Sequence, residues 1–283
     1  MIGAPERVRR RLALVCVLLA AACSGPSGPA GNDAGNDSVN AADAIGSNAA
    51  ATNAAAPAAP AKPFKLEDKS EALEFSYAYP AQAAAIPAVA EKLTGQMDKA
   101  KADALKAAAE DQKSAKEADY PFRQHSLQTT WTVHADTPRF LGLVGETYVY
   151  TGGAHGMTAW SGLLWDKQAA KDIPVTALMT SPAAFAASMS GRFCDALDDA
   201  RAEKRGEKVK RGADDFSICV DPMQQVLTPE AGKGGGIDRI RVIIGPYEAG
   251  PYAEGSYEID VPVDAAMIKA IKPEYRAAFV AGR

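Results

Sequence analysis

The stretch Tyr148-Val-Tyr-Thr-Gly-Gly-Ala-His-Gly156 is the most distinctive local pattern in this chain. An apolar and aromatic run enters two adjacent glycines, Gly152 and Gly153, and His155 stands directly before a third glycine, Gly156. Glycine is favoured where a chain needs a positive φ angle, or where another backbone or a ligand approaches closely. A second strand-like run, Thr158 to Trp165, comes after the glycines. The stretch therefore predicts a β-hairpin with a wide, glycine-rich tip.

Outward from this hairpin, further strands are predicted where apolar residues alternate or run together between turn residues. The segments are Leu73–Tyr79, Leu127–Val133, Phe140–Val144, Thr147–Tyr150, Phe216–Val220, Ile237–Ile244 and Ser256–Val261. Helical spacing predicts a long helix over about residues 84–118. Ser181-Pro182 predicts the start of a second helix that frays into the charged run Arg201–Arg211, and Asp264 and Pro273 start two short closing helices. Strands and helices segregate along the chain, which favours an α+β fold.

The N-terminal segment has the composition of a secretory signal. Positive residues from Arg7 to Arg11 precede the apolar run Leu12–Ala22, which is short for a membrane-spanning helix. The run ends in Leu-Ala-Ala-Ala-Cys23-Ser-Gly, which resembles the lipobox of bacterial lipoproteins. The resemblance implies a lipoprotein signal peptide over residues 1–22 and a lipid on Cys23, and the alternative is ordinary cleavage. Because Ser24 stands where Asp would retain a Gram-negative lipoprotein, we expect a periplasmic protein anchored to the outer membrane.

Composition then divides the chain beyond the signal. Residues 23–62 consist almost entirely of Ala, Asn, Gly, Ser, Pro and Asp, too polar to offset the entropy of ordering, and predict a disordered tether. Residues 1–22 hold four Arg and one Glu of the 31 basic and 35 acidic residues, so the remainder carries 27 and 34, a net charge of −7. This balance argues against a nucleic-acid partner. It suits a cationic partner, although an acidic surface also serves solubility.

Two cysteines remain in the folded part, Cys194 and Cys219. An even pair in an oxidising compartment predicts a disulfide, and two buried free thiols are the alternative. Zinc is less favoured, because the pair includes no Cys-x-x-Cys. We expect no metal and no cofactor.

A second motif, Pro246-Tyr-Glu-Ala-Gly-Pro-Tyr-Ala253, lies roughly a hundred residues after the Gly-Gly-Ala-His-Gly motif. In this order the two motifs resemble the extracytoplasmic region of the RsiV-type anti-sigma factors. They also resemble the non-catalytic N-terminal part of PdaC-type peptidoglycan deacetylases and many bacterial lipoproteins of unknown function. The resemblance implies two small antiparallel-sheet α+β domains with packed helices, over residues 63–157 and 158–283. It also implies lysozyme binding, as in the anti-sigma factors, without their cytoplasmic and transmembrane segments.

His155 has two interpretations. It could act as a general base or metal ligand, but we favour a hydrogen bond to backbone groups that fixes the hairpin tip. The other histidines, His125 and His134, are nine residues apart, which places them on opposite faces of one strand and makes a joint metal site with His155 unfavourable. Other catalytic patterns are missing from the sequence: there is no Gly-x-Ser-x-Gly, and Gly232–Gly236 lacks the ending of a phosphate loop.

Tyrosines make rigid amphipathic anchors at interfaces, so the second motif predicts either a contact surface or a tight structural double turn. The sequence thus favours a lipid-anchored periplasmic binding or sensor protein, not an enzyme, with lysozyme-like protein or peptidoglycan as its hypothesised partner. The expected binding residues are Gly152, Gly153, His155, Gly156, Tyr247, Glu248 and Tyr252. The alternatives are a cell-wall hydrolase that uses His155 with a carboxylate such as Glu248, and a purely structural envelope lipoprotein.

Overall fold

A computed structural model describes residues 60–282 and has a mixed α+β fold. Its larger sheet has six strands in the order β1-β2-β3-β4-β5-β6. Their bounds are Phe64–Lys69, Leu73–Tyr79, His125–Asp136, Phe140–Tyr150, Met157–Asp166 and Lys171–Ile173. All neighbouring strands are antiparallel except β2 and β3, which are parallel.

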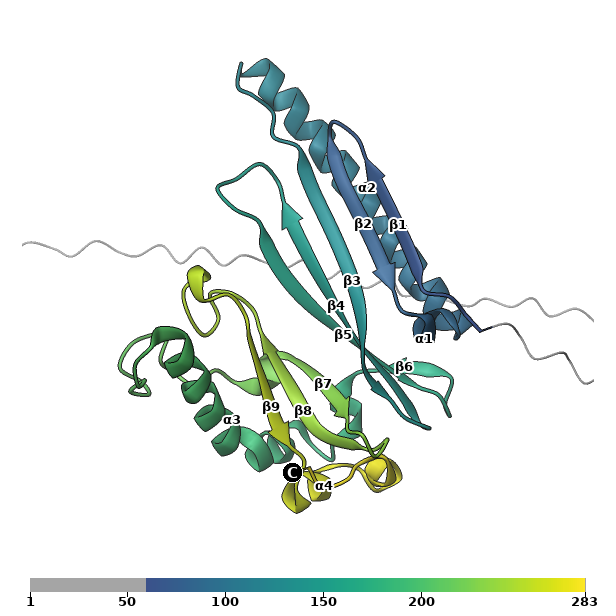
Figure 1. Cartoon of the computed structure of the whole chain (residues 1–283), viewed down its shortest axis with the longest axis vertical. Helices are drawn as coiled ribbons and strands as arrows, with labels where there is room; N and C mark the ends of the chain where they lie inside the picture. Colours follow the sequence, from purple (N-terminus) through teal and green to yellow (C-terminus); the bar gives the residue numbers. More distant parts are fainter. Residues whose placement is uncertain (1–59, 283) are drawn as a thin grey trace, which may run out of the picture. The chain divides into compact units, whose positions relative to one another are not determined.

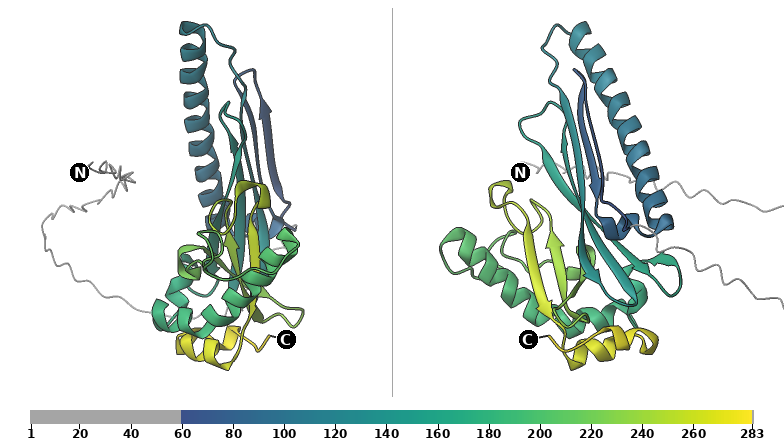
Figure 2. Two further views of the ribbon diagram at one scale, coloured as in Figure 1. Left: turned by 90° about the vertical axis from the view of Figure 1, so that its left-hand side faces the viewer. Right: turned by 45° about the vertical axis from the view of Figure 1, so that its right-hand side comes forward.

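The parallel pair is possible because a long connection joins β2 to β3, as a parallel crossover requires. This connection contains the short helix α1, Ala81–Ala84, and the 31-residue helix α2, Pro87–Glu117. Figure 2 shows α2 running along one face of the sheet. The expected helix over residues 84–118 is therefore confirmed in position. The chain does contain one strand–helix–strand unit, which the segregated sequence pattern did not predict.

The smaller sheet has three antiparallel strands, β7, β8 and β9. These strands are Val226–Ala231, Ile237–Ile244 and Tyr257–Pro262, accompanied by the helices α3, Pro182–Arg205, and α4, Ala265–Ala270. Short 3-10 turns η1 to η4 lie at Val175–Leu178, Pro222–Gln224, Tyr252–Glu254 and Pro273–Ala278. The predicted helix starts are confirmed, because Ser181 accepts a hydrogen bond from the N–H of Ala184 and Asp264 accepts one from Met267.

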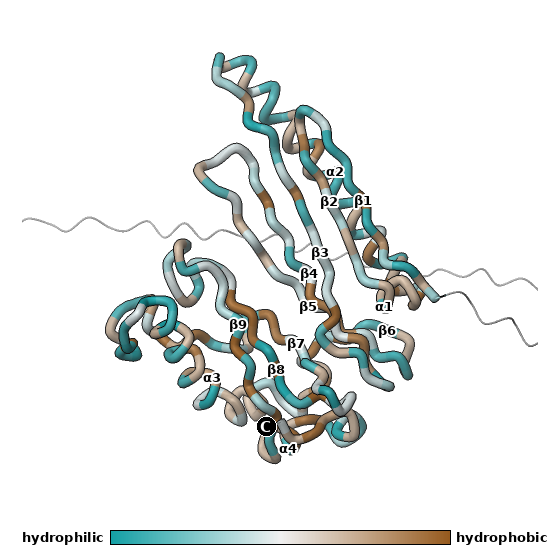
Figure 3. Tube along the Cα trace, in the orientation of Figure 1, coloured by the Kyte–Doolittle hydropathy of each residue, from teal (hydrophilic) through white to brown (hydrophobic). Residues whose placement is uncertain are grey.

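Two hydrophobic cores result from the alternation of side chains along β4 and β5. Leu143 and Leu163 on one face belong to the core under α2, whereas Phe140 and Leu164 on the other face belong to the core of the smaller sheet. The strongly apolar segments in Figure 3 gather along β8 and β9 and at the end of the larger sheet that packs with them. The strands β4 and β5 thus join the two cores, and they extend beyond them toward the hairpin tip (Figure 1).

The expected division of β4 into two strands is wrong. The two strands expected at Phe140–Val144 and Thr147–Tyr150 form the single strand β4. The glycine between them, Gly145, does not interrupt the strand. It is needed for packing, because a Cβ at this position would lie 2.8 Å from the Trp131 ring of β3. The boundary expected between residues 157 and 158 falls inside the larger sheet, since β5 is the hydrogen-bonded partner of β4.

Within residues 60–282, none of the helices combines the length and apolar character needed to cross a membrane. The expected signal peptide, Cys23 and the tether up to residue 59 lie outside the described residues.

Candidate functional site

The tip of the β4–β5 hairpin, residues 151–156, depends on two of its three glycines. Gly152 has a φ angle of +86°, a left-handed conformation that side chains rarely adopt. Gly156 is buried, and a Cβ there would lie 2.3 Å from the ring of Tyr148. A Cβ at Gly153 would approach only the carbonyl of His155, at 4.0 Å. Backbone strain and close packing therefore require glycine at positions 152 and 156, and not at 153.

The segment after α2 contacts the tip from one side. Arg123 donates hydrogen bonds from Nη1 to the carbonyl oxygens of Gly152 and Gly153, both at 3.2 Å. Nearby, Asp111 of α2 accepts from His125 Nε2 at 3.3 Å and from the hydroxyl of Tyr120 at 3.3 Å. His125 therefore has a structural contact, and it does not share a site with His155.

The tip meets the second motif through Tyr252. The ring centroids of His155 and Tyr252 are 3.9 Å apart and their planes differ by 24°. The hydroxyl of Tyr252 donates to the carbonyl oxygen of Gly156 at 2.8 Å, across 96 residues of sequence. The same oxygen lies 2.9 Å from Nδ1 of His155, so Nδ1 carries the proton and donates. The structure thus brings the two motifs together at one carbonyl group.

Tyr247 lies beside this contact in the loop over residues 245–256, which we call the Pro-Tyr loop. Its ring centroid is 5.6 Å from that of Tyr252, and 51% of the residue is exposed. Its φ angle of +69° is uncommon for a bulky residue. Such a conformation costs roughly 1–3 kcal/mol and persists only where the surroundings enforce it. The next residue, Glu248, is exposed.

Arg201 of helix α3 holds the backbone of the Pro-Tyr loop next to Tyr247. This side chain is fully buried, and its Nε donates to the carbonyl oxygen of Ala249 at 2.9 Å. Its Nη2 donates to the carbonyl oxygen of Ile218 at 2.8 Å, and its Nη1 to Asp198 at 3.2 Å. Burial lowers the pKa of Arg201, and the neighbouring Asp198 opposes that shift. The expectation that the helix frays into the charged run from Arg201 onward is therefore wrong, because α3 continues to Arg205.

The next turn of α3 fixes the far end of the Pro-Tyr loop. Arg205 forms two contacts with the carboxylate of Glu254, Nε to Oε1 at 2.8 Å and Nη2 to Oε2 at 3.1 Å. The hydroxyl of Tyr257 donates to the same carboxylate. Burial alone would raise the pKa of Glu254, but the hydrogen bonds from Arg205 and Tyr257 outweigh it and lower the pKa. Burial, with the hydrogen bond to Glu254, raises the pKa of Tyr257 to about 12.

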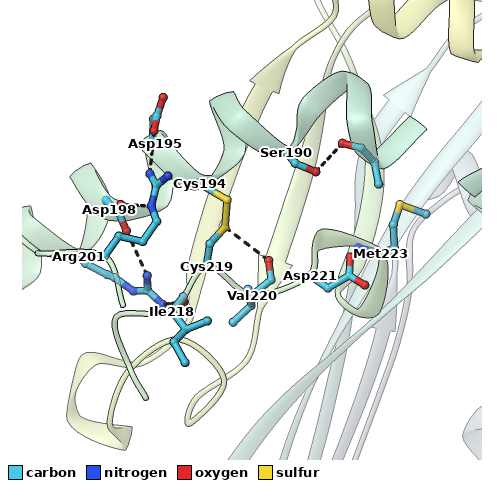
Figure 4. The surroundings of a disulfide bond; sticks show 12 residues. Ser190, Cys194, Asp195, Asp198, Arg201, Ile218, Cys219, Val220, Asp221 and Met223 are labelled. Carbon is cyan, nitrogen blue, oxygen red and sulfur yellow. Dashed lines mark hydrogen bonds and ion pairs between the residues drawn. A yellow bond between two sulfur atoms is a disulfide. The ribbon is translucent and has the colours of Figure 1, made fainter. Parts of the chain in front are cut away.

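A disulfide between Cys194 and Cys219 connects α3 to the segment that leads into β7 (Figure 4). The predicted pairing is confirmed. Residues 216–220 around Cys219 form a turn that continues into irregular backbone, and the strand expected there is wrong. The carbonyl of Ile218 is instead used by Arg201, as Figure 4 shows. The disulfide and Arg201 therefore fix the same segment, and closing a loop of this size contributes about 3 kcal/mol by loop entropy.

The catalytic interpretation of His155 finds no partner in the described residues. No ion pair or hydrogen bond between His155 and a carboxylate occurs in residues 60–282, and Glu248 is not among its contacts. The same residues contain no group of three His, Cys, Asp or Glu side chains that could hold a metal ion. His134 lies elsewhere, where its Nδ1 contacts Glu230 of β7. The interpretation as a hydrolase stays a hypothesis.

Comparisons with known proteins find one partial family match and two similar solved structures. Residues 66–158 match the family model described as deacetylase PdaC, which spans β1 to the start of β5. A solved DUF3298 family protein from Pseudomonas aeruginosa PAO1 is 14% identical with a TM-score of 0.45, covering 80% of this chain and 99% of that one. A second, from Bacteroides fragilis, is 16% identical with a TM-score of 0.44, covering 77% and 96%. No curated protein matches.

Proposed function

We propose that this chain is a binding or sensor protein of the bacterial cell envelope, not an enzyme, held at the outer membrane by a lipid on Cys23. Three observations support localisation to the envelope. They are the lipoprotein-like leader, the resemblance of the two motifs to envelope proteins and the partial match to the PdaC model. Labelling with a fatty-acid analogue tests the anchor. The lipid should be incorporated by the natural chain and lost in Cys23→Ala, and equal labelling of both would contradict the proposal.

The observation that carries the binding function is the contact between Tyr252 and the hairpin tip. It gathers His155, Tyr247 and Tyr252 into one surface, which we call the tyrosine–histidine patch, and Glu248 is the exposed residue that follows Tyr247. Tyrosines held in fixed positions lose little entropy on binding and are common interface anchors. Since Arg201 and Arg205 already order the Pro-Tyr loop, a partner would meet a preorganised surface.

Two exposed apolar side chains lie just below the tip, on the other face of the hairpin from the Pro-Tyr loop. Val149 and Met157 are paired across the hairpin directly below the tip, and they are 37% and 40% exposed. Strand alternation places both on the face of Leu143 and Leu163, which belong to the core under α2, whereas Thr158 and Trp160 face the Pro-Tyr loop. Val149 and Met157 therefore lie outside the tyrosine–histidine patch, and the binding proposal rests on the residues of the patch itself.

We propose a lysozyme-like protein as the partner, with peptidoglycan as the alternative. The net charge of −7 beyond the signal peptide favours a cationic protein over a neutral polymer, because opposite charges accelerate encounter. Isothermal titration of the protein with lysozyme tests this, and the absence of heat at high micromolar concentrations would overturn it. Titration with soluble peptidoglycan fragments tests the alternative in the same way.

A structural role for the patch predicts a different outcome. If the patch binds, Tyr247→Ala should weaken lysozyme about tenfold or more while the unfolding midpoint changes little, since the side chain is half exposed. Leu105→Ala is the matched control, because Leu105 is 41% exposed on α2 and does not belong to the patch. A purely structural patch would show unchanged affinity in both variants.

A further inference from the structure

Two adjoining hollows lie on the face of the β4–β5 hairpin that points toward the smaller sheet. The first, of about 440 Å³, lies between β4–β5 and the Pro-Tyr loop, with Thr158 and Tyr252 in its lining. The second, of about 250 Å³, lies between β3–β5 and β8–β9. Glu146 and Trp160 line both hollows and therefore stand where the two meet.

Glu146 and Trp160 are direct cross-strand partners in the β4–β5 pairing. Side chains at such positions project from the same face with Cβ atoms about 5 Å apart. Glu146 is exposed, and it has no ion pair among the residues the structure describes. Trp160 is partly exposed, whereas Trp131 and Trp165 are only 6% and 7% exposed. An accessible indole and an unneutralised carboxylate thus stand side by side.

The cationic groups of the hollows are already occupied. Arg241 contacts Asp260 at 2.7 Å and 3.0 Å and Glu258 at 3.0 Å. These hydrogen bonds raise its pKa and keep it charged. His134, the other basic group in the lining, contacts the buried carboxylate of Glu230. The side chains that could neutralise Glu146 are therefore committed to other carboxylates, and the junction has an unbalanced negative charge.

We infer that Glu146 and Trp160 form a binding site for an arginine side chain of a partner protein. A guanidinium group is planar, stacks on an indole and donates two parallel hydrogen bonds to a carboxylate. Lysine offers only a compact, strongly hydrated charge and should bind more weakly. That a protein supplies the arginine rests on the proposed function, whereas the chemistry of the site rests on these two residues alone.

Three short blocked peptides test the site: Gly-Arg-Gly, Gly-Lys-Gly and Gly-citrulline-Gly. Citrulline has nearly the shape of arginine without its charge. Tryptophan fluorescence of the whole protein reports binding, because the other two tryptophans are buried. The arginine peptide should give a saturable change, the lysine peptide one about threefold weaker, and citrulline none. Equal responses to all three peptides would overturn the inference.

Variants locate the response. Glu146→Gln should weaken the arginine peptide about fivefold, and Trp160→Phe should remove most of the fluorescence change. Glu110→Gln makes the same charge change on an exposed part of α2 and should leave affinity unaltered. Circular dichroism melts confirm that each variant folds. Unchanged affinity in Glu146→Gln would overturn the site, as would a response to a neutral chito-oligosaccharide with none to arginine.

The two proposals fail separately. If lysozyme gives no heat while the arginine peptide binds, the lysozyme partner is wrong and the arginine site stands. If lysozyme binds the natural protein and Glu146→Gln with equal affinity, and the arginine peptide gives no response, the site is wrong and the proposed function stands.

Discussion

Tyr252 covers the ring of His155, with 3.9 Å between centroids, and donates its hydroxyl to the carbonyl of the adjacent residue, Gly156. One side chain therefore makes a stacking contact and a hydrogen bond with the same hairpin tip. The two contacts are separable by substitution, because phenylalanine keeps the ring and loses the hydroxyl. Their separation shows which contact fixes the surface that we propose for binding.

We expect Tyr252→Phe to lower the free energy of unfolding by about 1 kcal/mol, the usual net value of one neutral hydrogen bond. Urea unfolding measures this. Tyr275→Phe is the matched control, since the Tyr275 hydroxyl has no hydrogen-bond partner in residues 60–282 and its loss should change stability by less than about 0.5 kcal/mol. Equal losses in both variants would show that the contact with Gly156 contributes nothing.

The hairpin tip offers a second matched pair, Gly156→Ala and Gly153→Ala. A methyl group at Gly156 would lie 2.3 Å from the Tyr148 ring, so the ring or backbone must move, at a cost of about 1–3 kcal/mol. At Gly153 the nearest atom is 4.0 Å away, so alanine should be tolerated within about 0.5 kcal/mol. Thermal unfolding distinguishes the two. A loss confined to Gly153→Ala would contradict the packing described for the tip.

The sequence was informative where local chemistry decides the structure. Glycines and prolines marked the hairpin tip and the Pro-Tyr loop, and Ser181 and Asp264 marked helix starts that the structure confirms. The sequence pattern could not predict the hydrogen bond from Tyr252 to Gly156, because 96 residues separate the two. That contact depends on how α3 and β9 position the loop, which is a property of tertiary packing.

Other features were missed for identifiable physical reasons. Strand β7 contains Pro229, which argues against a central strand but is tolerated here because β7 is an edge strand. Arg201 was expected at the start of the charged run in which the helix frays. It nevertheless continues the buried stripe of α3, which recurs at every fourth residue from Phe185 through Met189, Phe193 and Leu197. Its position in this stripe indicates burial, and that position decides the structure although arginine is usually exposed.

Removing that buried arginine should be costly. Arg201→Met keeps much of the volume but leaves the carbonyls of Ala249 and Ile218 without their donor, and we expect a loss of about 3 kcal/mol or more. Arg211→Met is the control, since Arg211 forms a more exposed pair with Asp195 and should cost under about 1 kcal/mol. Chemical unfolding gives both values. Similar losses would mean that Arg201 does not order the Pro-Tyr loop.

The carboxylate of Glu254 should make stability depend on acid pH. Its pKa in the folded protein lies below the ordinary value of 4.5, because hydrogen bonds from Arg205 and Tyr257 outweigh the effect of burial. A group with a lowered folded pKa contributes stability above its unfolded pKa and loses it as pH falls through the folded pKa. The contribution should therefore be complete at pH 6 and decline below about pH 4.5.

Glu254→Gln isolates this effect, because glutamine cannot titrate. Between pH 6 and pH 3 the variant should lose less unfolding free energy than the natural protein, although it is less stable at pH 6. Glu110→Gln, which removes an exposed carboxylate of α2, should track the natural curve. Asp166 and Asp260 also have lowered pKa values and remain in both proteins, so part of the acid dependence should persist. Parallel curves for Glu254→Gln and the natural protein would show that the Arg205–Glu254 pair is not linked to folding.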